Sequence, residues 1–78
     1  MVYCRLISVN NGVAKYSIGS LIDDITGILV VDSNEETYSI EKQPDKRELY
    51  MRHVGAMMCK NKDVLSQGIF PEKMSYEI

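Results

Sequence analysis

The chain has 78 residues, of which 45% are hydrophobic and 26% charged, and its formal net charge is −2. This length allows one small domain spanning residues 1–78 and excludes a catalytic domain with a separate lid. The apolar and charged fractions are ordinary for a globular protein, so the composition does not indicate disorder.

The first 18 residues predict a β-hairpin. Asn11 and Gly12 favour a two-residue type I′ turn, because both positions of that turn take a positive φ. The turn would pair Asn10 with Val13 and Val9 with Ala14, and the same register then pairs Ile7 with Tyr16 and Arg5 with Ile18. One face of the hairpin would be apolar, with Tyr3, Ile7, Val9, Ala14, Tyr16 and Ile18, and the other would carry Cys4, Leu6, Ser8, Lys15 and Ser17.

A second hairpin follows a loop over residues 19–26. The β-branched content of residues 27–32 predicts a strand, and the alternation of residues 37–41 predicts its return. The polar residues 33–36 would form the turn and pair Val31 with Tyr38 and Leu29 with Ile40. Ile28 and Val30 would then face the other side of the sheet, which is either partly covered or an interface.

The next segment predicts an amphipathic helix over about residues 46–60. Asp45 is a suitable N-cap, and Glu48 stands at the capping-box spacing. Gly55, inside this helix, costs up to about 1 kcal/mol relative to alanine. Its presence suggests close approach to the sheet or to a second helix across a dimer. The apolar stripe comprises Leu49, Tyr50, Val54, Met57 and Met58.

The end of the chain predicts a short helix over 62–67, stopped by Gly68, and a final strand over 74–78. The complete order is four strands, one main helix and one strand. We therefore expect an α+β domain in which the helix packs on one face of a small antiparallel sheet. The alternative is an SH3-like or split barrel.

The most promising candidate site is the loop that contains Asp23, Asp24 and Thr26. Two carboxylates and a hydroxyl could dock a basic partner or hold a divalent cation, but the spacing of a calcium-binding loop is absent. The simpler alternative is that these residues cap a turn and face water. We therefore expect no metal site.

The histidine and the cysteines carry little further chemistry. His53 could be a general base only with a partner that the sequence does not name, and a packed position beside the apolar stripe explains it as well. Because no signal peptide is recognised, Cys4 and Cys59 are expected to be free, buried thiols in a reducing compartment. Zinc would need four Cys or His ligands, and we expect no cofactor.

The distribution of charge is more informative than any single residue. Residues 19–41 contain six acids and no base, whereas residues 42–62 contain six bases against two acids, a net charge of +4. The two segments could attract each other within a protomer or across a dimer, or the acidic segment could dock on a basic protein. Alternatively, the basic segment could bind nucleic acid phosphates, although the low pI of about 5.2 argues against this as the main role.

These observations favour a small, cytoplasmic, non-enzymatic protein that binds another protein, of the regulator, immunity or inhibitor type, and that forms a homodimer. The longest apolar run, residues 28–31, is too short to span a membrane.

The partner-binding residues would be Asp23, Asp24, Thr26, Asp32, Glu35 and Glu36. A second hypothesis is nucleic-acid binding through Lys46, Arg47, Arg52, Lys60 and Lys62. A third is a small metal-dependent enzyme or metal-binding protein that uses Asp23, Asp24 and His53.

Overall fold

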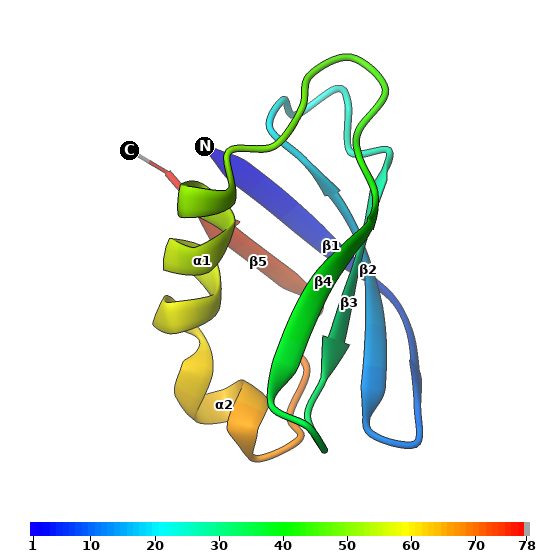
Figure 1. The fold of residues 1–78 in the computed structure, drawn as a ribbon, viewed down its shortest axis with the longest axis vertical. Coiled ribbons are helices and arrows are strands. Elements are labelled where there is room, and N and C mark those ends of the chain that lie inside the picture. Colours follow the sequence, from blue (N-terminus) through cyan, green and yellow to red (C-terminus); the bar gives the residue numbers. More distant parts are fainter. Residues whose placement is uncertain (78) are drawn as a thin grey trace.

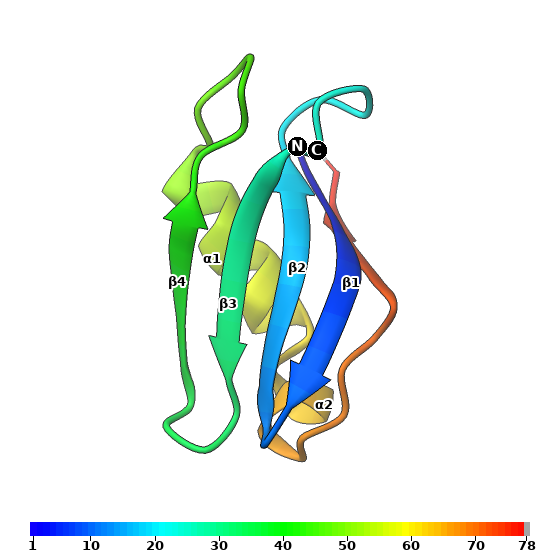
Figure 2. The same ribbon diagram turned by 90° about the vertical axis from the view of Figure 1, so that its right-hand side faces the viewer.

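The first four strands follow one another as antiparallel neighbours in the computed structural model, which describes residues 1–77. Their bounds are Val2–Asn10 for β1, Val13–Gly19 for β2, Gly27–Asp32 for β3 and Thr37–Lys42 for β4. The last strand, β5 (Lys73–Tyr76), pairs with β1, and the sheet order is β4-β3-β2-β1-β5 (Figure 2). The expected α+β fold is confirmed, and β4 and β5 are the two edges of an open sheet.

The two helices cover one face of this sheet (Figures 1 and 2). They are α1 (Met51–Lys60) and α2 (Lys62–Ser66), and Gly68 ends the second with a φ of +75°, as the sequence predicts. Apolar side chains from the strands and helices form one core between the layers. Its largest fully buried members are Tyr16, Ile18, Leu29, Met57, Val2 and Val54.

The first hairpin has the predicted turn but a different register beyond it. Asn11 and Gly12 have φ values of 53° and 78°, and Asn10 pairs with Val13 as expected. A β-bulge between Leu6 and Ser8 then shifts the register, so that Leu6, rather than Ile7, faces Tyr16. The extra residue exchanges the two faces of the strand before it.

This shift corrects the predicted apolar face of β1. Cys4 lies opposite Ile18 and is buried together with Val2, whereas Ile7 is 56% exposed. The type I′ turn specifies only the pairs next to it, and the bulge allows the start of β1 to bury the side chains that meet α1 and β5. The core therefore gains Cys4 and loses Ile7, and Val9, which was also predicted on the apolar face, is 49% exposed near the turn.

The second hairpin is confirmed in its strands and in its two predicted pairs, and the register shifts only at the far end, between Ile28 and Leu29. Val31 pairs with Tyr38 and Leu29 with Ile40, around a turn over residues 33–36. Ile28 and Val30 are half-buried and alternate with the buried Leu29 and Val31, so they point to the sheet face away from the core. The final strand is β5, which begins one residue before its expected start, and Ile78 lies outside the described residues.

The sequence predicts the start of the main helix about five residues too early. α1 begins at Met51, its N-cap position is Tyr50, and no side chain caps it. Asp45 is not a cap, because the helix begins six residues after it. The Asp45 carboxylate pairs with Lys42, its backbone N–H donates to Thr26 Oγ1, and the chain bends over residues 45–47. Glu48 is exposed and makes no capping bond to this helix. Tertiary hydrogen bonds hold this connection in a conformation that the local capping signal did not indicate.

No helix within residues 1–77 is long and apolar enough to cross a membrane.

Gly55 lies in α1 where the helix faces β4. A Cβ atom added to it would meet only the Tyr38 hydroxyl, at 3.4 Å, which is an ordinary contact distance. We therefore expect Gly55→Ala to stabilise the fold by up to about 1 kcal/mol, because alanine is the better helix former. Thermal unfolding should show a melting temperature raised by a few degrees. A lowered melting temperature would mean that α1 approaches β4 more closely than this geometry shows.

Candidate functional site

The acidic residues that the sequence groups into one surface lie at opposite ends of β3. Asp23, Asp24 and Thr26 belong to the loop before this strand, and Glu35 and Glu36 to the turn after it. Figure 1 shows the loop at the upper end of the molecule and the turn at the lower end. The chain therefore offers two separate candidate sites, which we describe in turn.

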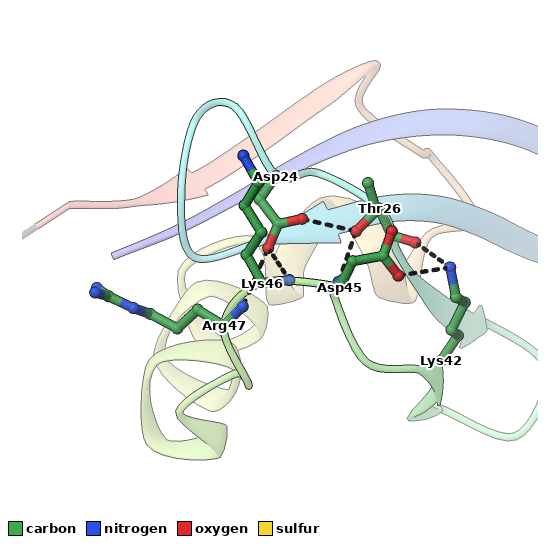
Figure 3. A network of polar contacts seen from close by, with 6 residues as sticks. All are labelled: Asp24, Thr26, Lys42, Asp45, Lys46 and Arg47. Carbon is green, nitrogen blue, oxygen red and sulfur yellow. Dashed lines mark hydrogen bonds and ion pairs between the residues drawn. The ribbon is translucent and has the colours of Figure 1, made fainter.

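The first candidate is centred on Asp24, whose side chain is only 1% exposed. Its Oδ1 accepts a hydrogen bond from the Thr26 hydroxyl at 2.9 Å. Its Oδ2 accepts bonds from the backbone N–H groups of Lys46, at 2.8 Å, and Arg47, at 3.2 Å (Figure 3). The carboxylate thus joins the loop over 20–26 to the connection over 43–50.

The loop lies directly against the end of β2. Gly19 ends this strand, and a Cβ atom there would overlap the Asp24 carbonyl oxygen. Gly27 is similarly confined, because its Cβ would lie 2.7 Å from the Lys42 carbonyl oxygen. The glycines that bracket the loop therefore allow close backbone approach. This approach places the Asp24 carboxylate within hydrogen-bond distance of Lys46 and Arg47 in the connection.

The surroundings of Asp24 stabilise its charged form. Burial alone would raise the pKa of this carboxyl. The N–H of Lys46, the hydroxyl of Thr26, the N–H of Arg47 and the nearby Lys46 ammonium together outweigh burial, and the pKa lies below its usual value. Asp24 is therefore an ionised acceptor for backbone donors at neutral pH.

This arrangement makes Asp24 a structural residue and removes it from any surface that a partner could touch. Thr26 is likewise occupied, because its Oγ1 donates to Asp24 and accepts from the N–H of Asp45. Asp23, by contrast, is exposed and lies 3.5 Å from the Lys46 ammonium. The simpler sequence interpretation, that these residues cap a turn and face water, fits the exposed Asp23 but not Asp24, which is buried and accepts N–H groups from a remote segment.

Replacement of Asp24 should be much more damaging than replacement of its neighbour. Asp24→Ala would leave two backbone N–H groups without their acceptor, and we expect a melting temperature lower by roughly 10 °C. Asp23→Ala is the matched control. It removes only an exposed ion pair, so little change is expected. Similar melting temperatures for the two variants would show that the Asp24 network does not hold the connection.

The lowered pKa of Asp24 also predicts how stability varies with pH. A carboxyl with a depressed pKa in the folded state stabilises the fold above its unfolded pKa, which is about 3.9. The contribution is lost as the pH falls through the folded pKa. We therefore expect urea titrations to give the largest difference in free energy of unfolding between the wild type and Asp24→Ala at pH 7. This difference should decrease below about pH 4. A difference independent of pH would contradict the role of the charge.

The second candidate is the turn between β3 and β4. Asp32 Oδ1 accepts the backbone N–H groups of Asn34, at 2.9 Å, and Glu35, at 3.2 Å. The side chains of Ser33 and Asn34 donate to the carbonyl oxygens of Gly12 and Asn11, which ties this turn to the neighbouring hairpin. These bonds use Asp32 within the turn and leave two acidic side chains, those of Glu35 and Glu36, exposed at the tip.

A groove with a volume of about 290 Å³ lies beside this turn, between β4 and the two helices. Tyr38 lines it from the strand, and Gly55 and Met58 line it from α1. Glu36 and Lys62 contribute charged groups to its lining. The groove and the acidic turn therefore form a continuous surface at one end of the molecule. We define the docking end as Glu35, Glu36, Tyr38, Gly55, Met58 and Lys62.

The groove also contains Cys59, which is exposed rather than buried as the sequence suggested. Cys4 is buried, and the loss of hydration raises the pKa of its thiol to about 12. Neither thiol forms a disulfide. The difference arises because Cys59 is in the last turn of α1, where the strands leave the groove open.

His53 lies at the other end of α1, packed between Tyr50 and Tyr76 at ring distances of 5.2 and 5.9 Å. Desolvation, the chain's amino terminus and Arg52 lower the pKa of its imidazole. Within residues 1–77, no three His, Cys, Asp or Glu side chains are grouped so that they could hold a metal ion. The combination of Asp23, Asp24 and His53 therefore does not form a metal cluster.

The basic residues of the nucleic-acid hypothesis are all exposed but divided between two regions. Lys46 and Arg47 lie in the connection before α1, beside the Asp24 network, and Arg52 lies in the first turn of the helix. Lys60 and Lys62 lie at the opposite end of α1. Lys46 is also paired with Asp23. The structure therefore does not gather these five side chains into one basic surface.

The sequence predicted Glu35 and Glu36 as partner-binding residues and Lys62 as a nucleic-acid-binding residue, but it did not predict the groove that Glu36 and Lys62 line. One signal for the groove was present in the sequence, because Gly55 is a poor helix former inside a predicted helix. In the structure this glycine lies opposite the Tyr38 hydroxyl. Nothing local indicates that Met58, Cys59 and Tyr38 would meet around an open space. Comparison with protein-family models, curated proteins and solved structures finds no match to this chain.

Proposed function

We propose that this chain is a non-enzymatic protein-binding module, of the regulator or inhibitor type, whose docking end binds a basic surface on a partner protein. The observation that carries this proposal is the rigid acidic turn. Glu35 and Glu36 are exposed on a turn whose backbone is fixed by Asp32, Ser33 and Asn34. A fixed turn loses little conformational entropy when a partner binds, which favours affinity.

The two exposed carboxylates supply orientation and a faster encounter with a basic partner. Acidic side chains at the rim of an interface act chiefly on the association rate, and salt screens them. The groove supplies apolar contact area next to these charges, from Tyr38 and Met58. We therefore expect a partner segment in which basic residues stand beside at least one apolar side chain.

The state of the cysteines suits this role in the cytoplasm. Both thiols are free, and Cys59 is exposed in the groove, where a reducing compartment would keep it unmodified. We propose that compartment on this ground.

Reversal of charge at the turn tests the proposal. The tagged chain is incubated with extract of its source cell at low salt, and retained proteins are identified by mass spectrometry. We expect Glu35→Lys with Glu36→Lys to retain at least about tenfold less of the specific partner, because attraction becomes repulsion. Retention by the wild type should also fall as salt is raised.

The matched control is Glu72→Lys with Glu77→Lys, which changes the net charge equally at exposed positions outside the turn. This control should retain the partner as the wild type does. Equal retention by the turn variant and the wild type would show that the acidic turn is not the docking site.

A further inference from the structure

The outer edge of β4 carries backbone groups that no described strand covers. β4 pairs only with β3 and ends the sheet, and no further strand lies beside its outer edge in Figure 2. Its side chains are mostly exposed, with Tyr38 at 39%. An uncovered edge strand is a template for addition of another strand.

The register shows which backbone groups point outward from this edge. Asp32 of β3 pairs with Val13 of β2, and the residues that flank this pair are bonded to each other, since the N–H of Ser33 donates to the Gly12 carbonyl oxygen. In an antiparallel ladder this pattern marks Asp32 and Val13 as a pair without direct hydrogen bonds between them. The backbone groups of Asp32 therefore point toward β4 and meet those of Thr37. By alternation, the N–H and C=O groups of Tyr38 and Ile40 face the open edge.

The two ends of β4 carry opposite charges. The acidic turn with Glu35 and Glu36 precedes the strand. Lys42 ends the strand and is followed by Asp45, Lys46 and Arg47, so residues 42–47 carry three bases and one acid, a net charge of +2. Lys42 and Lys46 pair with Asp45 and Asp23 within the chain, but both lysine side chains stay exposed. An antiparallel neighbour of the same sequence would place its basic end beside this acidic end, and the reverse at the other end. A parallel neighbour would bring like charges together.

We infer that a second copy of this chain binds at the β4 edge, strand against strand and antiparallel, to form a twofold dimer with a continuous sheet. This inference rests on the proposed function, because it names a second copy of the chain as one protein that the acidic turn binds. In the register that places Ser39 opposite Ser39 of the second copy, Tyr38 faces Ile40 of that copy. This register uses every outward N–H and C=O group of both residues, and other registers leave some of them unpaired.

The side chains are compatible with the same register. Tyr38 and Ile40 lie on the face of the sheet that carries the helices, because their partners Val31 and Leu29 are buried there. The pairing therefore sets an aromatic side chain against a β-branched one across the dimer, which is a favourable cross-strand pair. The regular pairing ends at Ile40, because the register of β4 shifts at Glu41, before Lys42. Beyond the paired residues, the Glu36 end of each copy lies beside the Lys42 end of the other.

Sedimentation and amide exchange of the purified wild type test the inference without a mutation. We expect a concentration-dependent equilibrium between monomer and dimer in analytical ultracentrifugation. Under conditions that favour the dimer, hydrogen exchange followed by NMR should show the Tyr38 and Ile40 amides protected. The same two amides should exchange faster when dilution favours the monomer, whereas those of Thr37 and Ser39 stay protected in both states.

A charge exchange between the two ends of β4 provides the second test. Glu36→Lys and Lys42→Glu should each weaken self-association about tenfold, because both symmetry-related contacts become repulsive. The double variant E36K/K42E exchanges the charges and should restore association to within a few fold of the wild type. Circular dichroism of each variant checks that it is folded.

A monomer at millimolar concentration would overturn the inference, and so would a dimer in which Tyr38 and Ile40 exchange as fast as in the monomer. Protection of these amides only on addition of a captured protein would assign the edge to that protein instead. The two proposals fail separately. If the wild type is monomeric but charge reversal at Glu35 and Glu36 still abolishes partner capture, only the dimer proposal is wrong.

Discussion

The hydrogen bonds accepted by the buried Asp24 carboxylate are the interaction on which the rest of this structure depends. Asp24 is the only buried charged residue in the described part of the chain, and these bonds join it to residues 22 and 23 positions later in the sequence. The carboxylate satisfies backbone donors of Lys46 and Arg47 at the point where the chain leaves the sheet to enter α1. Because unpaired buried donors are costly, this connection has one well-defined path.

That path determines what each end of the molecule can do. At the Asp24 end, Lys46 pairs with Asp23 and Lys42 with Asp45 within the chain, and these ion pairs stay exposed at the surface. At the other end, Asp32 is the only acidic side chain that the turn bonds use, and the two glutamates of the turn remain exposed beside the groove. Part of the charge asymmetry seen along the sequence is thus used within the fold, and the rest lies where a partner can reach it.

The groove and the β4 edge share one cause, which is how far the helices extend across the sheet. α1 and α2 pack over the central strands and bury Leu29 and Val31, but they leave Tyr38 of β4 partly exposed. Gly55 leaves space where a larger side chain would narrow the gap toward Tyr38. An open edge, an apolar groove and an acidic turn therefore lie next to one another.

The sequence by itself determined the features that depend on a few consecutive residues. These include the Asn11–Gly12 turn with its positive φ values, the pairing of Val31 with Tyr38, and the stop at Gly68. The bulge in β1, the late start of α1, the burial of Asp24 and the exposure of Cys59 were decided only by the tertiary structure. Each depends on contacts between segments remote in sequence. Local signals such as alternation or a capping spacing carry no information about which distant donor, strand or helix will meet a given side chain.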